Sequence, residues 1–123
     1  MTIDEWIGEH MKVLSSEQGK AEAEIVFPED FALFAGHFPG NPTLPGVCEI
    51  ICAEILLSKV LGRVPTLVEI GKAKFFAPVS PGKTLNIKIE WIEKEGQLEL
   101  SAGLSVNGNK TAGFKKVLFD LLK

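Results

Sequence analysis

Several residue types are scarce or absent in this 123-residue sequence, and each of these scarcities excludes some of the functions that the chain could have. Tyrosine is absent, so no phenol can serve as an acid. The two cysteines, Cys48 and Cys52, are four residues apart, which provides neither a disulfide framework nor the two-pair pattern of a zinc site. We therefore interpret both as small apolar residues of the core.

Charge of one sign is not concentrated anywhere in the sequence. The 13 basic and 16 acidic side chains give a net charge of −3, and no Lys/Arg block supplies an electrostatic footprint for nucleic acid or an anionic membrane. The most apolar stretch, 44–61, contains Glu49, Glu54 and Lys59, which are too costly to place in hydrocarbon. We expect no nucleic-acid partner and no membrane association.

The first ten residues contain acids where a secretory signal needs a basic start followed by an apolar core. We therefore expect a cytoplasmic protein. A length of 123 residues is typical of one domain, so we expect a single domain over 1–123. Hydrophobic residues make up 46% of the chain, which supplies a sizeable core and excludes disorder.

The hydrophobic spacing predicts two helices and five strands. A short helix is predicted behind the N-cap Thr2, where apolar residues recur at helical spacing as far as Leu14. A long helix is predicted over 45–61, opened by Pro45 and closed by Gly62, and its apolar residues occupy two faces, which predicts an enclosed helix. Alternating patterns predict strands at 21–27, 67–79, 84–93, 97–106 and 110–119.

The turns between the later strands predict an antiparallel sheet. Pro81-Gly82 is typical of a type II turn, and Asn107-Gly108 is typical of a type I′ hairpin. The apolar face of such a sheet must be shielded from solvent by another element, and the long helix is the one long apolar element available. The predicted fold is therefore α+β, with an antiparallel sheet wrapped around one central helix.

The segment 36–50, GHFPGNPTLPGVCEI, carries the strongest functional signal. Its three prolines stiffen the loop and restrict the residues before them, which fixes His37 in place. The loop ends at the start of the long helix, where free backbone N–H groups can stabilise negative charge that develops on an oxygen. A base beside such a site suits abstraction of the α-proton of a thioester.

This segment resembles the signature of the β-hydroxyacyl-acyl carrier protein dehydratases, which have the hot dog fold. The residues that carry the resemblance are His37-Phe38-Pro39, Pro42 and Pro45-Gly46-Val47. It extends upstream through Glu29-Asp30-Phe31 and downstream from Lys74-Phe75 to Pro81-Gly82. The resemblance implies a hot dog fold, pairing of two sheets edge to edge, no metal or other cofactor, and His37 as the catalytic base.

The sequence departs from this family at one position that matters for catalysis. The resemblance places a helical carboxylate fourteen residues after the histidine, where this chain has Ile51. An aliphatic side chain cannot protonate the leaving hydroxyl group. Glu54 lies on the same predicted helix face as Ile51, whereas Glu49 lies nearer the sheet-facing side, so the acid is Glu54, Glu49 or no helical carboxylate. The implied substrate-binding residues are Phe38, Gly46, Val47 and Ile51.

Three functions remain open on these grounds. The first is dehydration of a 3-hydroxyacyl thioester on acyl carrier protein or coenzyme A, with His37 as base and Glu54 as a displaced acid. The second is a catalytically silent hot dog protein that binds an acyl carrier or pairs with a dehydratase subunit. The third is an acyl thioesterase.

Because one sheet edge and the helix face of Val47, Ile51 and Glu54 are left uncovered in one chain, we also expect a homodimer or higher oligomer.

Overall fold

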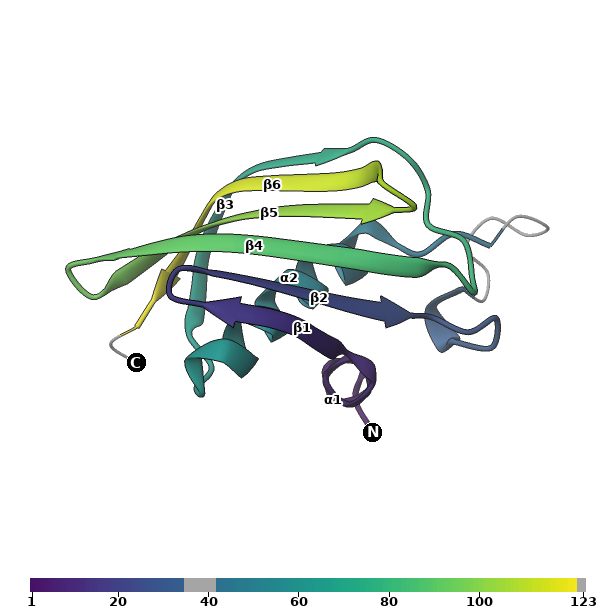
Figure 1. The fold of residues 1–123 in the computed structure, drawn as a ribbon, viewed down its shortest axis with the longest axis horizontal. Coiled ribbons are helices and arrows are strands. Elements are labelled where there is room, and N and C mark those ends of the chain that lie inside the picture. Colours follow the sequence, from purple (N-terminus) through teal and green to yellow (C-terminus); the bar gives the residue numbers. More distant parts are fainter. Residues whose placement is uncertain (35–41, 122–123) are drawn as a thin grey trace.

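The computed structural model describes residues 1–34 and 42–121. These residues form a six-stranded antiparallel sheet with the strand order β1-β2-β4-β5-β6-β3 (Figure 1). The strands are β1 Lys12–Glu17, β2 Lys20–Val26, β3 Thr66–Phe75, β4 Thr84–Lys94, β5 Gln97–Val106 and β6 Asn109–Asp120. The helices are α1 Ile3–His10, the short 3-10 helix Ala32–Phe34, and α2 Gly46–Leu61.

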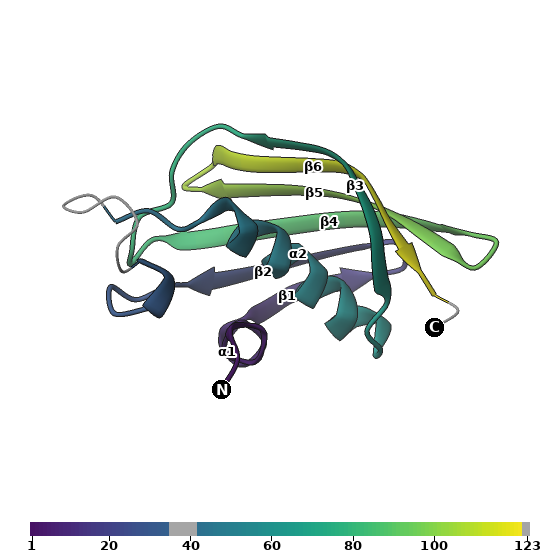
Figure 2. The same cartoon turned by 180° about the vertical axis from the view of Figure 1, so that it is seen from behind.

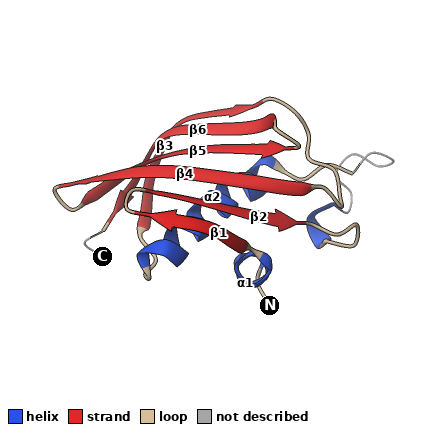
Figure 3. Cartoon of the chain, viewed as in Figure 1, coloured by secondary structure: helices blue, strands red, loops and turns tan. Residues whose placement is uncertain are grey.

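The sheet curves around α2, which lies against its concave face (Figures 2 and 3). The predicted α+β arrangement is therefore confirmed. Alternation positions the core, because Leu85, Ile87 and Ile89 of β4 are buried, whereas Lys88 and Glu90, which follow Ile87 and Ile89, are exposed. The buried residues of α2 are Cys48, Glu49, Ile50, Cys52, Ala53, Leu56 and Leu57.

Two hairpin turns place β4, β5 and β6 in register. Asn107 and Gly108 have φ values of 51° and 80°, which confirms the predicted type I′ geometry. Glu95 and Gly96 have the same two φ values, 51° and 80°, although glutamate rarely occupies the first central position of such a turn. The three strands β4, β5 and β6 are thus connected by two tight turns.

The predicted N-terminal helix is too long. The capping box is present, since Thr2 and Glu5 exchange backbone–side-chain hydrogen bonds of 2.9 and 3.1 Å, but α1 ends at His10. Leu14 lies instead in β1, which pairs with β2 and was not predicted as a strand. The helical spacing of the apolar residues continues into a segment that pairs with β2 as an edge strand, whose six residues are all exposed.

The predicted strand 67–79 also ends too late. β3 stops at Phe75 because the backbone N–H groups of Phe76 and Ala77 both turn to the carbonyl oxygen of Thr111, at 2.9 and 3.5 Å. Pro78 follows and cannot donate a ladder hydrogen bond. The segment between β3 and β4 is therefore a loop that returns across the start of α2.

β3 forms an exposed edge of the sheet with apolar side chains. Every residue of this strand is exposed, and among the described strands it pairs only with β6. Val68 is 54% exposed and Phe75 is 55% exposed, while Val47 on the neighbouring start of α2 is 58% exposed. The prediction that α2 is enclosed on both apolar faces is therefore wrong at its first turn in a single chain.

Within the two described ranges, neither α1 nor α2 has the length and apolar character needed to cross a membrane.

Candidate functional site at the start of α2

The site begins at the first turn of α2, where the sequence changes from a proline-rich loop to a helix. Pro45 is the N-cap and provides no side-chain hydrogen bond, so the first N–H groups of the helix depend on other partners. A Cβ atom at position 46 would lie 2.7 Å from Cε1 of Phe75, so a residue larger than Gly46 would displace that ring. The backbone N–H of Leu44 donates to the carbonyl oxygen of Val79 at 2.9 Å and anchors this end of the loop.

His37 and Phe38, the predicted base and one predicted substrate contact, lie outside the described residues. The chain on both sides of them is held in the core, since Phe34 and Leu44 are buried. Phe34 also packs edge to face on Phe31, with ring centroids 6.1 Å apart. The ends of the segment that carries His37 are therefore fixed by packing, and its C-terminal end leads directly into α2.

The helix face predicted to meet the substrate contains Val47, Ile51 and Glu54. Val47 is exposed, whereas Ile51 is partly buried and packs against the core. Glu54 is partly buried and lines a hollow of about 250 Å³. The other residues that line this hollow are Asp4, Glu5, Ile55, Ser58, Val64, Pro65 and Phe119. The face therefore continues from an open apolar turn to an acidic hollow beside α1.

The environment of Glu54 favours its protonated form. Burial raises the pKa of its carboxyl group, and the negative charge of Asp4 raises this pKa further. A carboxyl group that retains its proton to higher pH is better suited to act as a general acid. Glu54 thus lines a hollow and has a raised pKa, which are two properties expected of a general acid.

Glu49 faces the opposite direction, into the molecule. Its side chain is only 3% exposed, and Thr111 Oγ1 of β6 donates a hydrogen bond of 2.7 Å to its Oε1 atom. Burial raises the pKa of Glu49, and this hydrogen bond from Thr111 opposes part of the increase. The helix geometry predicted the sheet-facing direction, but Thr111 lies 62 residues away in sequence, and no local pattern indicated this partner.

Phe75 was also missed as a part of this site. The resemblance included Lys74-Phe75 only as a strand motif, yet the Phe75 ring packs on Gly46 and lies 5.8 Å from the ring of Phe114. Position 75 thus forms an apolar wall beside the first turn of α2.

Across residues 1–34 and 42–121, no cluster of three or more His, Cys, Asp or Glu side chains is placed to hold a metal ion.

Comparison with known proteins identifies relatives of this chain. Residues 13–114 match the ApeI-like family, described as ApeI dehydratase. The 3-hydroxyacyl-acyl-carrier-protein dehydratase FabZ of Clostridium tetani is 33% identical over 118 residues, which cover 88% of this chain and 82% of the relative. The FabZ protein of Enterococcus faecalis is 32% identical over 109 residues, covering 82% and 76% of the two chains.

Solved structures give the same assignment. A chain of the dehydratase heterocomplex ApeI:P from Xenorhabdus doucetiae superposes with a TM-score of 0.73 and 28% identity, covering 89% of this chain and 94% of that one. Mouse thioesterase superfamily member 2 has a TM-score of 0.75 and 15% identity, covering 95% and 86%, which shows a shared fold alone. This chain is a hydroxyacyl-thioester dehydratase-like protein of hot dog fold, and it belongs to the ApeI-like dehydratase family.

Proposed function

We propose that this chain removes water from a 3-hydroxyacyl thioester carried by acyl carrier protein or coenzyme A, and that His37 and Glu54 perform the proton transfers. The observation that carries the proposal is the joining of the His37 loop to the uncapped first turn of α2 in a chain of the dehydratase family. Relatives named for the acyl-carrier-protein substrate support this substrate class.

The proposed elimination uses two side chains and two backbone N–H groups of this chain. His37 takes the α-proton of the thioester, and the electron pair of that C–H bond becomes part of the new carbon–carbon double bond. The C–O bond at C3 breaks, and Glu54 gives its proton to the departing hydroxyl group, which leaves as water. The N–H groups of Gly46 and Val47 stabilise the negative charge on the thioester oxygen.

Two observations favour Glu54 over Glu49 as the acid. Glu54 lines a hollow and is partly exposed, whereas Glu49 is enclosed and accepts a hydrogen bond from Thr111. A group that transfers a proton to substrate must reach it within hydrogen-bond distance. Glu49 therefore has a structural role in this proposal, because it joins the first turn of α2 to β6.

The proposal is tested by incubating the purified chain with crotonyl thioesters of coenzyme A and of acyl carrier protein. Hydration to the 3-hydroxybutyryl thioester, followed by mass spectrometry, supports the dehydratase activity in its reverse direction. Release of free thiol without hydration would instead indicate a thioesterase. Absence of both reactions with both carriers would contradict an independent enzyme.

We also propose that two copies of this chain pair through β3. The strand supplies an unpaired edge ten residues long, and its exposed apolar side chains continue into Phe75 and Val47. Pairing of two such edges would satisfy the free backbone groups and cover the first turn of α2. The active site would then lie at the junction of two copies.

Light scattering of the purified chain is expected to give twice the mass of one chain. The double variant Val68→Glu/Ile70→Glu is expected to shift the protein to monomer, because it places like charges next to each other on the pairing edges. Ile92→Glu is the matched control, since Ile92 is an exposed apolar residue at the far end of β4. A wild-type monomer, or equal dissociation of the control, would contradict pairing through β3.

A second candidate function is that of one subunit in a mixed complex. Position 51 is isoleucine and packs against the core, and a structural relative is a chain of a dehydratase heterocomplex. In this case His37 would act with a carboxylate from a different chain. Activity that appears only after addition of a second dehydratase-like subunit, and is lost with His37→Ala, would support this candidate over the independent enzyme.

A further inference from the structure

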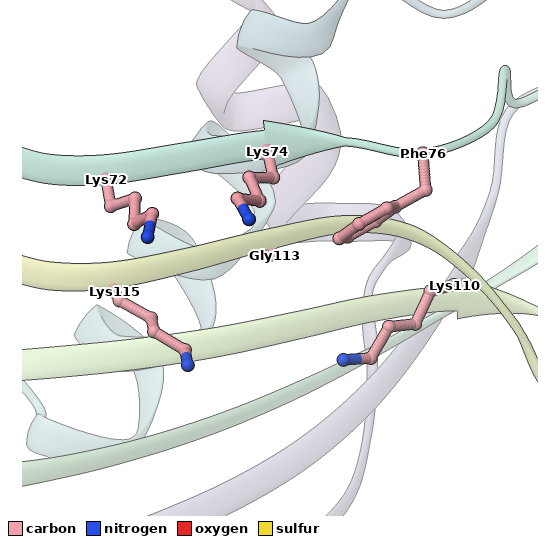
Figure 4. Close-up of a pocket in the computed structure, with 6 residues that line it drawn as sticks. All are labelled: Lys72, Lys74, Phe76, Lys110, Gly113 and Lys115. Atoms are coloured by element: carbon pink, nitrogen blue, oxygen red, sulfur yellow. The ribbon is translucent and has the colours of Figure 1, made fainter.

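The outer face of the sheet, opposite α2, carries a cluster of lysines around a hollow. Lys72 and Lys74 of β3 and Lys110 and Lys115 of β6 line a space of about 240 Å³, together with Phe76 and Gly113 (Figure 4). All four ammonium groups lie on the side of the sheet away from α2, which is visible behind the strands. This lysine cluster is therefore separate from the candidate active site.

The strand register brings like charges together in this cluster. Lys72 of β3 is the direct cross-strand partner of Lys115 in β6. Like charges directly opposite each other on neighbouring strands are destabilising, so the isolated chain holds an unfavourable pair here. A bound anion would convert this repulsion into attraction.

Glycine and phenylalanine shape the hollow between the lysines. Gly113 pairs with Lys74 on one side and with Gly103 of β5 on the other, so two adjacent strands lack a side chain at this level. A Cβ atom on Gly113 would lie 3.6 Å from Cε2 of Phe76, whose ring closes one end of the hollow. The ammonium group of Lys110 lies 5.9 Å from the centroid of that ring.

The charge at this hollow contrasts with that of the whole chain. Its six lining residues include four cations and no carboxylate, although the net charge of the protein is −3. Glu90 lines the adjoining hollow with Lys88, Lys110 and Lys115. The sequence contains no basic block, because 36 residues separate Lys74 from Lys110 and only the pairing of β3 with β6 brings them together.

We infer that this hollow is a binding site for a small phosphate-bearing anion. Ammonium groups act as point charges that bind phosphate oxygens, and the small recessed volume suits a phosphate or pyrophosphate group better than a macromolecular surface. The exposed ring of Phe76 can in addition contact a nucleobase attached to such a group. The inference is independent of the proposed dehydratase reaction, and edge pairing through β3 leaves this face open.

The test is calorimetric titration of the full-length protein with inorganic pyrophosphate at low ionic strength. We expect saturable binding of one pyrophosphate per chain, weakened at least about tenfold by Lys72→Glu and by Lys115→Glu. Lys83→Glu is the matched control, because Lys83 is an exposed lysine in the turn before β4 and its replacement changes the net charge equally. The control is expected to change the affinity by less than about twofold.

A measurement on the unaltered protein accompanies the variants. Pyrophosphate is expected to slow acetylation of Lys72, Lys74, Lys110 and Lys115, read by peptide mass spectrometry, and to leave Lys83 unaffected. Unsaturable binding at about 1 mM, equal weakening by Lys83→Glu, or uniform protection of all lysines would overturn the site.

Adenosine diphosphate distinguishes the two sources of the phosphate group. Tighter binding of this nucleotide than of pyrophosphate, with the difference removed by Phe76→Leu, would assign the site to nucleotides. Equal affinity of both probes would assign it to the inorganic group. Both results retain the phosphate site, whereas failure of both probes to bind overturns it whatever the outcome of the dehydratase assay.

Discussion

The variant His37→Ala is expected to lower the rate of crotonyl-thioester hydration by about two to four powers of ten, with the fold retained. A positioned acid or base contributes this much, because in hydration the imidazole of His37 delivers to the α-carbon the proton that it removes in dehydration. The measurement is kcat/KM for hydration, together with circular dichroism of the variant. Turnover that stays within about twofold of wild type in a folded variant would exclude His37 as the base.

His10 provides the control for this experiment, since it is the other histidine of the chain. It is exposed on α1, where its ring stacks on Trp6 with centroids 3.9 Å apart and its Nδ1 atom lies 2.8 Å from the Trp6 carbonyl oxygen. These contacts are local to one helix. His10→Ala is therefore expected to preserve the hydration rate, so a loss in both variants would indicate a general effect of histidine removal.

The variant Glu54→Gln is expected to abolish the hydration activity of the wild type, because the amide can neither accept a proton from the attacking water in hydration nor donate one to the departing hydroxyl group in the reverse reaction. Ile51→Glu is expected to add little or to reduce the rate, since a second carboxyl group would crowd Glu54. It also costs about 1 to 3 kcal/mol of stability, because position 51 packs against the core. The readouts are hydration rate and melting temperature.

Glu49→Gln is the matched control for Glu54→Gln, because it makes the same chemical change five residues earlier on α2. Its carbonyl oxygen can still accept the hydrogen bond from Thr111, so folding and activity are expected to remain. A wild type without activity, combined with a gain of activity in Ile51→Glu, would assign the chain as a silent relative with an intact cavity. Loss of activity in Glu49→Gln alone would transfer the acid role to Glu49.

Much of the fold could be predicted from local patterns in the sequence. α2 begins and ends within one residue of its predicted bounds because proline and glycine mark both ends and Gly62 has the left-handed φ of 75° that a helix C-cap favours. β4 and β5 alternate clearly because one face is buried and the other is exposed. β1 could not be predicted, because its six residues are all exposed and show no such alternation.

The site was less predictable because its contacts join distant parts of the chain. Sequence indicated the direction of Glu49 from the helix geometry, but its partner Thr111 depends on where β6 crosses α2. The exposure of Val47 and the apolar edge of β3 depend on which surfaces one chain leaves uncovered. The assignment of Glu54 as the acid remains a prediction, since His37, the base with which it would act, lies outside the described residues.

The two cysteines on the inner side of α2 make unfolding of this protein observable by chemistry. Both thiols are buried, and burial raises the pKa of Cys48 to about 11 and that of Cys52 further, so thiolate is scarce at neutral pH. A thiol reagent can therefore react quickly only with molecules in which α2 has left the sheet. The labelling rate of these cysteines reports how often the core opens, without any engineered probe.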